Sequence, residues 1–118
     1  MLILVVDDEV AIVELLAELL SDEGYQVQTT YDGRNALSLL QAGLEPQIVI
    51  TDIMMPGLDG WGLYRALRSE LSQHDVGVVF MSAGRSRPTQ FSDPRATFVT
   101  KPFSILDMLD AIDRVAQA

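Results

Sequence analysis

The chain has 118 residues, 48% of them hydrophobic, no cysteine and a formal net charge of −9 at pH 7, which fits one cytoplasmic domain over residues 1–118. The lack of cysteine excludes disulfides and thiolate metal sites, and the acidic charge argues against direct contact of this domain with nucleic acid. No apolar run approaches the roughly 20 residues of a membrane-spanning helix, and the first residues lack the basic region and cleavage site of a signal peptide.

Short apolar runs alternate with amphipathic segments along most of the chain. Runs such as 2–6 are apolar throughout, which is typical of strands buried on both faces of a parallel sheet. This alternation predicts an α/β fold with a doubly wound, five-stranded parallel sheet and helices on both faces. In chain order we predict a strand at 2–6, a helix from 8 to about 23, a strand at 26–30, a helix from 32 to about 43, a strand at 47–51, a helix from 60 to about 71, strands at 76–81 and 96–100, and a helix at 105–115.

The segment 84–95 interrupts the alternation. It contains two prolines and no apolar face, although a helix would be expected between the last two strands. Pro88 could start a short helix, but Asp93 and Pro94 would stop it. We therefore expect the fourth helix to be short or distorted.

Polar side chains follow four of the predicted strands. Asp7 and Asp8 follow the first strand, Asp52 the third, Ser82 the fourth and Lys101 the fifth. In a sheet of this kind, ligands bind beyond the carboxyl ends of the strands. Each residue alone has an ordinary explanation: Asp8, for example, could cap the first helix. Their joint placement at one edge is much harder to attribute to chance.

The chemistry of this set points to a phosphoryl group. Clustered carboxylates repel one another, and Mg²⁺ would relieve that repulsion. With Lys101 as a second positive charge, the set could hold a phosphoryl group for in-line attack by a carboxylate. Asp52 is the favoured nucleophile because it stands alone on the central strand, whereas Asp7 and Asp8 form a pair suited to the metal. Ser82 is placed to hydrogen-bond the bound phosphate.

Four motifs stand at the ends of the predicted strands: Asp7-Asp8, Asp52 to Gly60, Met81-Ser82-Ala83 and Lys101-Pro102-Phe103. Together they resemble the receiver domains of two-component response regulators. The resemblance runs from residue 2 to about residue 117 and implies a (βα)5 flavodoxin-like fold. It also implies that a sensor histidine kinase or phosphotransfer protein donates a phosphoryl group, and that the domain then switches a surface that acts on an unknown output domain or protein. Such a domain is no enzyme beyond catalysing its own phosphorylation and dephosphorylation.

The resemblance also implies roles for individual residues at the acidic cluster. Asp52 matches the phospho-acceptor. Asp7 and Asp8 match the acidic pair at the Mg²⁺, together with Asp52 itself and the backbone carbonyl of Met54. Lys101 matches the lysine that contacts the phosphoryl group, and in the family a cis peptide bond joins this lysine to the following proline.

Two further residues match the switch of the family. Ser82 matches the switch hydroxyl and Phe98 the switch aromatic, so that phosphorylation would draw Ser82 inward and bury Phe98. Phe98 could instead be an ordinary core aromatic. We expect Asp59 to cap a helix and His74 to be exposed rather than catalytic.

Three other functions compete with this interpretation. A phosphorylation-independent, receiver-like interaction module is supported only by the unusual segment 84–95. An aspartyl-phosphate phosphatase would need its nucleophile after the first strand and a second acidic residue two positions on. Here position 9 is Glu9, and the isolated acid, Asp52, follows the third strand. A flavin-binding protein would need a phosphate-binding loop after the first strand, and the sequence has none.

Overall fold

Strands and helices alternate along the chain in the predicted order. The computed structural model describes residues 1–83 and 92–116, so the predicted short or distorted helix at 84–95 falls largely outside the described residues. No helix in these two ranges has both the length and the apolar character needed to cross a bilayer. The elements are β1 (Leu2–Val6), α1 (Val10–Asp22), β2 (Gln26–Thr30), α2 (Gly33–Gln41), β3 (Ile48–Asp52), α3 (Gly60–Arg65), the π-helical η1 (Ala66–Glu70), β4 (Gly77–Ala83), β5 (Ala96–Lys101) and α4 (Ile105–Ala116).

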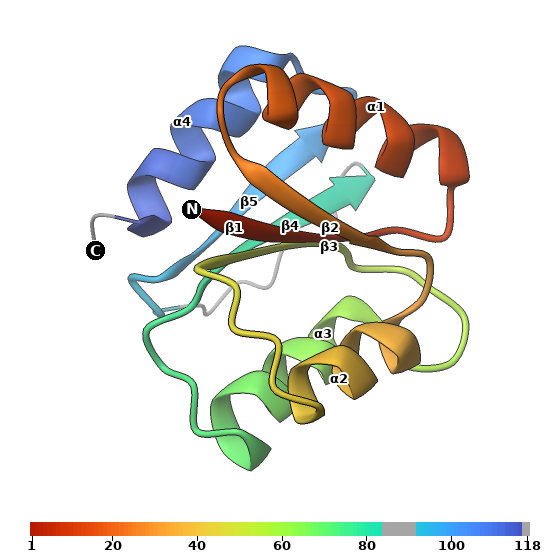
Figure 1. Cartoon of the computed structure of the whole chain (residues 1–118), viewed down its shortest axis with the longest axis vertical. Helices are drawn as coiled ribbons and strands as arrows, with labels where there is room; N and C mark the ends of the chain where they lie inside the picture. The colour runs from red at the N-terminus through yellow and green to blue at the C-terminus, as the bar shows by residue number, and fades with distance from the viewer. Residues whose placement is uncertain (84–91, 117–118) are drawn as a thin grey trace.

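The strands of the described residues form one parallel sheet in the order β2-β1-β3-β4-β5. Helices α1 and α4 cover one face of the sheet, and α2 and α3 cover the other (Figure 1). Because the strand order reverses after β2, the ends of β1 and β3 meet at a topological switch point. The predicted doubly wound α/β fold is thereby confirmed.

The central strands are buried on both faces because each supplies side chains to two cores. In β1, Ile3 and Val5 pack with α1 and α4, whereas Leu4 and Val6 pack with α2 and α3. All four side chains are fully buried, which explains why this run has no polar alternation. The edge strand β2 is more exposed: its first four residues alternate between exposed and half-buried, and only Thr30 is buried.

The helix ends show which acidic residues act as caps. Asp32 and Asp59 cap α2 and α3, and each side chain accepts a backbone N–H three residues on, at 2.7 and 2.8 Å. The cap predicted at Asp59 is thus confirmed. The N-cap of α1 is Glu9, which makes no side-chain capping bond, so the alternative reading of Asp8 as a cap is wrong. Gly24 ends α1 with a φ of 95°, a conformation that favours glycine.

The connection from β3 to α3 passes close to the end of β3. The N–H of Gly60 donates to the carbonyl of Ile53 at 2.9 Å. A Cβ atom at Gly60 would lie 2.3 Å from the carbonyl oxygen of Asp52. Glycine at this position therefore allows the helix to begin directly beside the strand end that carries Asp52.

Candidate functional site

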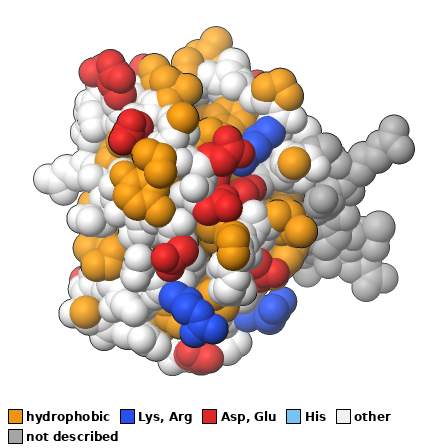
Figure 2. Space-filling view, turned by 90° about the vertical axis from the view of Figure 1, so that its right-hand side faces the viewer, with side chains coloured by type: hydrophobic (Ala, Val, Ile, Leu, Met, Phe, Trp, Pro, Cys, Tyr) orange, Lys and Arg blue, Asp and Glu red, His pale blue; other side chains and the backbone are white. Residues whose placement is uncertain are grey.

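Three carboxylates and one ammonium group lie at the C-terminal edge of the sheet. Asp7 and Asp8 follow β1, Asp52 ends β3 and Lys101 ends β5. Carboxylate oxygens of Asp7, Asp8 and Asp52 lie within 4.8 Å of one another. Figure 2 looks onto this edge and shows acidic side chains gathered near the middle of the face, beside a basic one. We call Asp7, Asp8, Asp52, Ser82 and Lys101 the edge site.

The ammonium group of Lys101 joins two of the carboxylates. Its Nζ donates to Asp7 Oδ2 at 3.0 Å and lies 3.5 Å from Asp52 Oδ1. Burial lowers the pKa of Lys101, but the hydrogen bond to Asp7 and the charges of Asp7, Asp52 and Glu9 outweigh burial and raise this pKa above its ordinary value. Lys101 is therefore held as a cation at the centre of the acidic group.

Asp52 is the carboxylate whose basicity is increased. Its side chain is almost fully buried, and Oδ1 accepts the N–H of Ile53 at 3.1 Å. Burial and the negative charge of Asp7 raise the pKa of Asp52, and Lys101 offsets only part of this effect. A carboxylate with a raised pKa is a better electron-pair donor, so its environment favours Asp52 as a nucleophile.

Asp7 and Asp8 differ in their surroundings. Asp7 is fully buried, and its second oxygen, Oδ1, accepts the N–H of Glu9 at 2.9 Å. Asp8 is exposed. One member of the pair is therefore fixed by the protein, while the other presents its carboxylate to solvent at the rim of the edge site.

Ser82 supplies a buried hydroxyl group beside these charges. Its side chain is fully buried in β4, and among the described residues its Oγ has no hydrogen-bond partner. A buried hydroxyl without a partner is costly, so a site that contains one is suited to a polar ligand. Ala83, the next residue, pairs with Lys101 in the sheet. The peptide bond between Lys101 and Pro102 is cis, as the resemblance implied.

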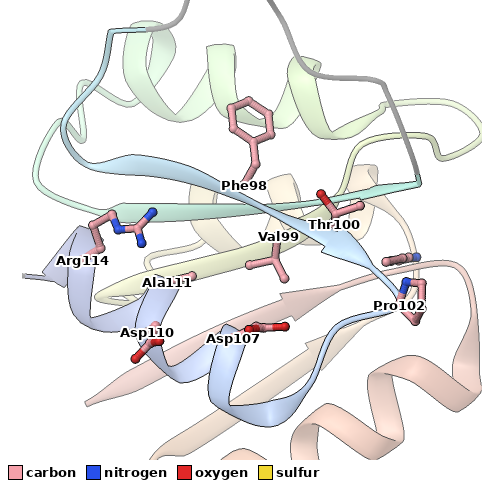
Figure 3. A pocket seen from close by; sticks show the side chains of 9 residues that line it. Phe98, Val99, Thr100, Pro102, Asp107, Asp110, Ala111 and Arg114 are labelled. Carbon is pink, nitrogen blue, oxygen red and sulfur yellow. The ribbon is translucent and has the colours of Figure 1, made fainter.

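Met54 and Phe98 are the remaining predicted site residues. Met54 follows β3, and its side chain is 69% exposed. Phe98 points from β5 toward α3, on the opposite face of the strand from Val99 (Figure 3). Its ring is half-buried and stacks on Phe80 at a centroid distance of 5.3 Å. Core packing thus accounts for its present position, and its role as a switch stays a prediction. His74 is exposed, as predicted.

A second polar cluster was missed by the sequence interpretation. Asp93 Oδ2 accepts the hydroxyl of Tyr64 at 2.6 Å and Nε of Arg68 at 2.9 Å. Arg68 also donates to the carbonyls of Gln73 at 2.8 Å and Arg95 at 3.3 Å. In the sequence, Asp93 and the proline after it predict only the end of a short helix. We call Tyr64, Arg68 and Asp93 the Asp93 cluster.

The pKa values of Tyr64 and Asp93 are both shifted further from neutral pH. Burial, the hydrogen bond to Asp93 and the charge of Asp93 raise the pKa of Tyr64 to about 12. Burial raises the pKa of Asp93, but hydrogen bonds from Tyr64, the N–H of Arg95 and Arg68 outweigh it, so the pKa lies below its ordinary value. Both groups therefore keep one protonation state through the neutral range, which suits a structural cluster.

The family model of the response regulator receiver domain matches residues 3–113. The chain belongs to this family. It is 40% identical over 105 residues to a probable transcriptional regulator, ycf27, of Cyanophora paradoxa, and 41% identical over 103 residues to the response regulator PleD of Caulobacter vibrioides. The matches cover 86% and 85% of this chain but only 42% and 22% of those relatives.

Solved structures of receiver domains have the same fold. The chemotaxis protein CheY4 of Vibrio cholerae superposes with a TM-score of 0.84 at 26% identity, covering 97% of each chain. The receiver domain of the Francisella response regulator 1452 gives a TM-score of 0.81 at 26% identity, covering 98% of this chain and 96% of that one. Both likenesses extend over nearly the whole receiver domain described above.

Proposed function

We propose that residues 1–118 form one phospho-acceptor receiver domain in which Asp52 takes a phosphoryl group. The observation that carries the proposal is the composition of the edge site: three converging carboxylates, one shared ammonium group and a buried hydroxyl without a partner among the described residues. Carboxylates alone would repel a phosphoryl group. Lys101 and a cation are needed to attract it, and Ser82 has an unused hydrogen-bond donor for it.

The proposed step is an in-line transfer to a carboxylate oxygen. An oxygen of Asp52 attacks phosphorus, the bond between phosphorus and the donor atom breaks, and the donor leaves with the bonding electron pair. Lys101 neutralises charge on the phosphoryl oxygens, and the Ser82 hydroxyl donates to one of them after a small movement. The raised pKa of Asp52 favours its attack as a nucleophile. The domain thus catalyses its own phosphorylation and later dephosphorylation, and no other reaction is proposed.

The oxygen ligands of the site suit Mg²⁺. Asp7, Asp8 and Asp52 would hold the ion with the backbone carbonyl of Met54, and hard oxygen ligands of this kind are those that Mg²⁺ prefers. The exposed rim position of Asp8 leaves room for the water ligands that Mg²⁺ usually retains. Bound Mg²⁺ would neutralise negative charge on the carboxylates and the phosphoryl group.

The proposed donor is a sensor histidine kinase or a phosphotransfer protein. A mostly apolar groove of about 450 Å³ lies between α1 and the segment after β5, and its lining includes Leu15, Lys101 and Phe103. Because Lys101 belongs to both the groove and the edge site, a protein held there would be next to Asp52. We infer that the domain meets such a donor in the cytoplasm.

The proposed output is a change of surface. Phosphorylation would draw Ser82 toward the phosphoryl group and let Phe98 move further into the space near Phe80, which would reshape the surface around β5. An output domain or separate protein would read this surface. A phosphoryl mimic at Asp52 that leaves residues 82–103 unmoved would contradict this part of the proposal.

The test is intact-mass measurement after incubation with acetyl phosphate, with and without Mg²⁺. We expect one added phosphoryl group on the wild type, none on Asp52→Asn and little without Mg²⁺. Circular dichroism of both proteins controls for folding. A folded wild type that gains no phosphoryl group under any condition would overturn the proposal and favour the phosphorylation-independent interaction module.

A further inference from the structure

A second pocket opens beside the edge site, on the side of α2. Its volume is about 510 Å³, and its lining includes Asp8, Tyr31, Arg34, Pro56 and Gly57. Asp8 belongs to both the pocket and the edge site. A small molecule that presents a phosphoryl group to Asp52 would therefore have space for its remaining atoms in this pocket.

Arg34 is the cationic side chain of this pocket. It lies in the first turn of α2, and its guanidinium group reaches over the loop after β3: a Cβ atom at Gly57 would lie 3.6 Å from Arg34 Nε. Gly57 has a φ of 74°, which favours glycine and keeps this wall of the pocket free of a side chain.

The guanidinium group of Arg34 is not used by the described part of the protein. The neighbouring Asp32 is engaged by Asn35, whose backbone N–H and side-chain amide donate to its two oxygens at 2.7 and 3.1 Å. Within residues 1–83 and 92–116, Arg34 makes neither an ion pair nor a hydrogen bond. Its five N–H donors are therefore available to a ligand.

The charge pattern makes this arginine unusual. Arg34 is the only basic residue among the first 64, which contain eleven acidic residues. Two of the residues that line this pocket, Asp8 and Asp32, are acidic, and Arg34 is the basic one. The planar guanidinium group binds carboxylates through two parallel hydrogen bonds, which distinguishes it from a lysine ammonium group.

We propose that Arg34 binds the leaving carboxylate of small acyl phosphates, so that the pocket is a leaving-group site for this class of donor. The inference rests on the proposed function of Asp52. In the reaction an oxygen of Asp52 forms the new bond to phosphorus, the bond between phosphorus and the acyl oxygen breaks, and the carboxylate leaves with the electron pair. No proton is needed. Arg34 stabilises the negative charge that develops on the leaving oxygen.

The experiment compares two donors that differ in their leaving group. Acetyl phosphate releases a carboxylate, whereas phosphoramidate releases neutral ammonia. The second-order rate constant of phosphorylation is measured by intact mass for wild type, Arg34→Ala, Arg34→Lys and the control Arg65→Ala, an exposed arginine on α3. With acetyl phosphate we expect Arg34→Ala to be about tenfold slower and Arg34→Lys to be intermediate. With phosphoramidate both should stay within about twofold of wild type, and Arg65→Ala should match wild type with both donors.

The outcomes separate this inference from the function on which it rests. If neither donor phosphorylates the folded wild type, the proposed function fails and the inference falls with it. If wild type reacts but Arg34→Ala slows both donors equally, Arg34 either attracts any anionic donor or contacts the phosphoryl group itself. Either result overturns the leaving-group site. An unchanged rate with acetyl phosphate overturns it as well, because the guanidinium group then makes no contact in the transition state.

Discussion

The edge site and the Asp93 cluster are both polar groups at the margin of the same sheet, but their hydrogen bonding and charge balance differ. At the edge site, three carboxylates share one ammonium group, and the buried Ser82 hydroxyl has no partner among the described residues. In the Asp93 cluster, one carboxylate faces a guanidinium and a phenol, and every polar side chain has a partner. Unmet charge and hydrogen-bonding capacity indicate a site for a ligand, whereas saturated capacity indicates a structural role.

The two aspartates illustrate the difference through their titration. Burial and the charge of Asp7 raise the pKa of Asp52, whereas hydrogen bonds that outweigh burial lower the pKa of Asp93. Ionised Asp52 is therefore a cost to the fold, and ionised Asp93 is a contribution to it. The edge site should affect phosphorylation more than stability, and the Asp93 cluster should do the reverse.

The largest expected effect is the loss of the cation at the edge site. Lys101→Met should lower the rate of phosphorylation by acetyl phosphate about 100- to 1000-fold, because it removes a charged donor that is aimed at the developing charge. Rates from intact mass, compared with Arg65→Met as a control for the loss of one positive charge, test this. A rate within about twofold of wild type would show that the edge site does not act through Lys101.

Most of the fold and the position of the edge site could be predicted from the sequence. The continuously apolar runs could be read as central strands because such strands are buried on both faces, and the residue after each strand must lie at one edge. The same rule led to the hypothesis that Asp52 is the nucleophile, since it is the single acidic residue at the end of the central strand. That role stays a prediction.

The Asp93 cluster could not be predicted, because Arg68 and Tyr64 lie 25 and 29 residues away from Asp93 in the sequence. Asp93 stands before a proline, which by local rules indicates a turn and gives no sign of a distant arginine. The packing of Phe98 on Phe80 could not be predicted either. Both rings lie on strands with apolar neighbours, and they meet because the register of β4 and β5 pairs Phe80 with Phe98. Local sequence patterns specify helices and strands, whereas long-range polar contacts depend on how those elements pack.

The second prediction concerns the Asp93 cluster. Arg68→Ala removes an ion pair and two bonds to backbone carbonyls from a mostly buried position, and should lower the free energy of unfolding by about 2–4 kcal/mol. Urea denaturation measures this, with Arg65→Ala on the same helical segment expected within about 0.5 kcal/mol of wild type. Where the protein remains folded, phosphorylation by acetyl phosphate should stay within about twofold. A large loss of phosphorylation without a loss of stability would reverse the roles assigned to the two clusters.

A third prediction tests the close approach beside Asp52. Gly60→Ala should lower the free energy of unfolding by about 1–3 kcal/mol, because the new methyl group meets the backbone of Asp52 and the strand end must move. It should also slow phosphorylation, since Asp52, the proposed nucleophile, moves with the strand. The matched control is Gly62→Ala, where the methyl group would meet the flexible end of the Leu58 side chain. If Gly60→Ala and Gly62→Ala had equal effects on stability and on phosphorylation, the close approach of Gly60 to the end of β3 would not be needed to position Asp52.

The smallest expected effects are changes in the free energy of unfolding on replacing Asp52 or Asp93 by asparagine. They test the contrast between the two clusters directly, because the two changes are expected to have opposite signs. Folding favours the protonated form of Asp52, so its ionisation costs stability as the pH rises above its ordinary pKa of 3.8. Asp52→Asn should therefore raise the free energy of unfolding at pH 7, and the gain should vanish as the pH falls below that value. Asp93 has a lowered pKa, so its contribution is present above 3.8 and is lost as the pH falls through its folded pKa.

Asp93→Asn should accordingly lower the free energy of unfolding at pH 7, and its deficit should shrink on acidification. Urea denaturation of wild type and both variants at several pH values between 3 and 7 gives the two differences directly. Both substitutions replace an aspartate by its neutral isostere, so each serves as the control for the other. Differences of the same sign at pH 7 would mean that both carboxylates serve the fold in the same way, and unmet charge would then no longer distinguish the edge site from the Asp93 cluster.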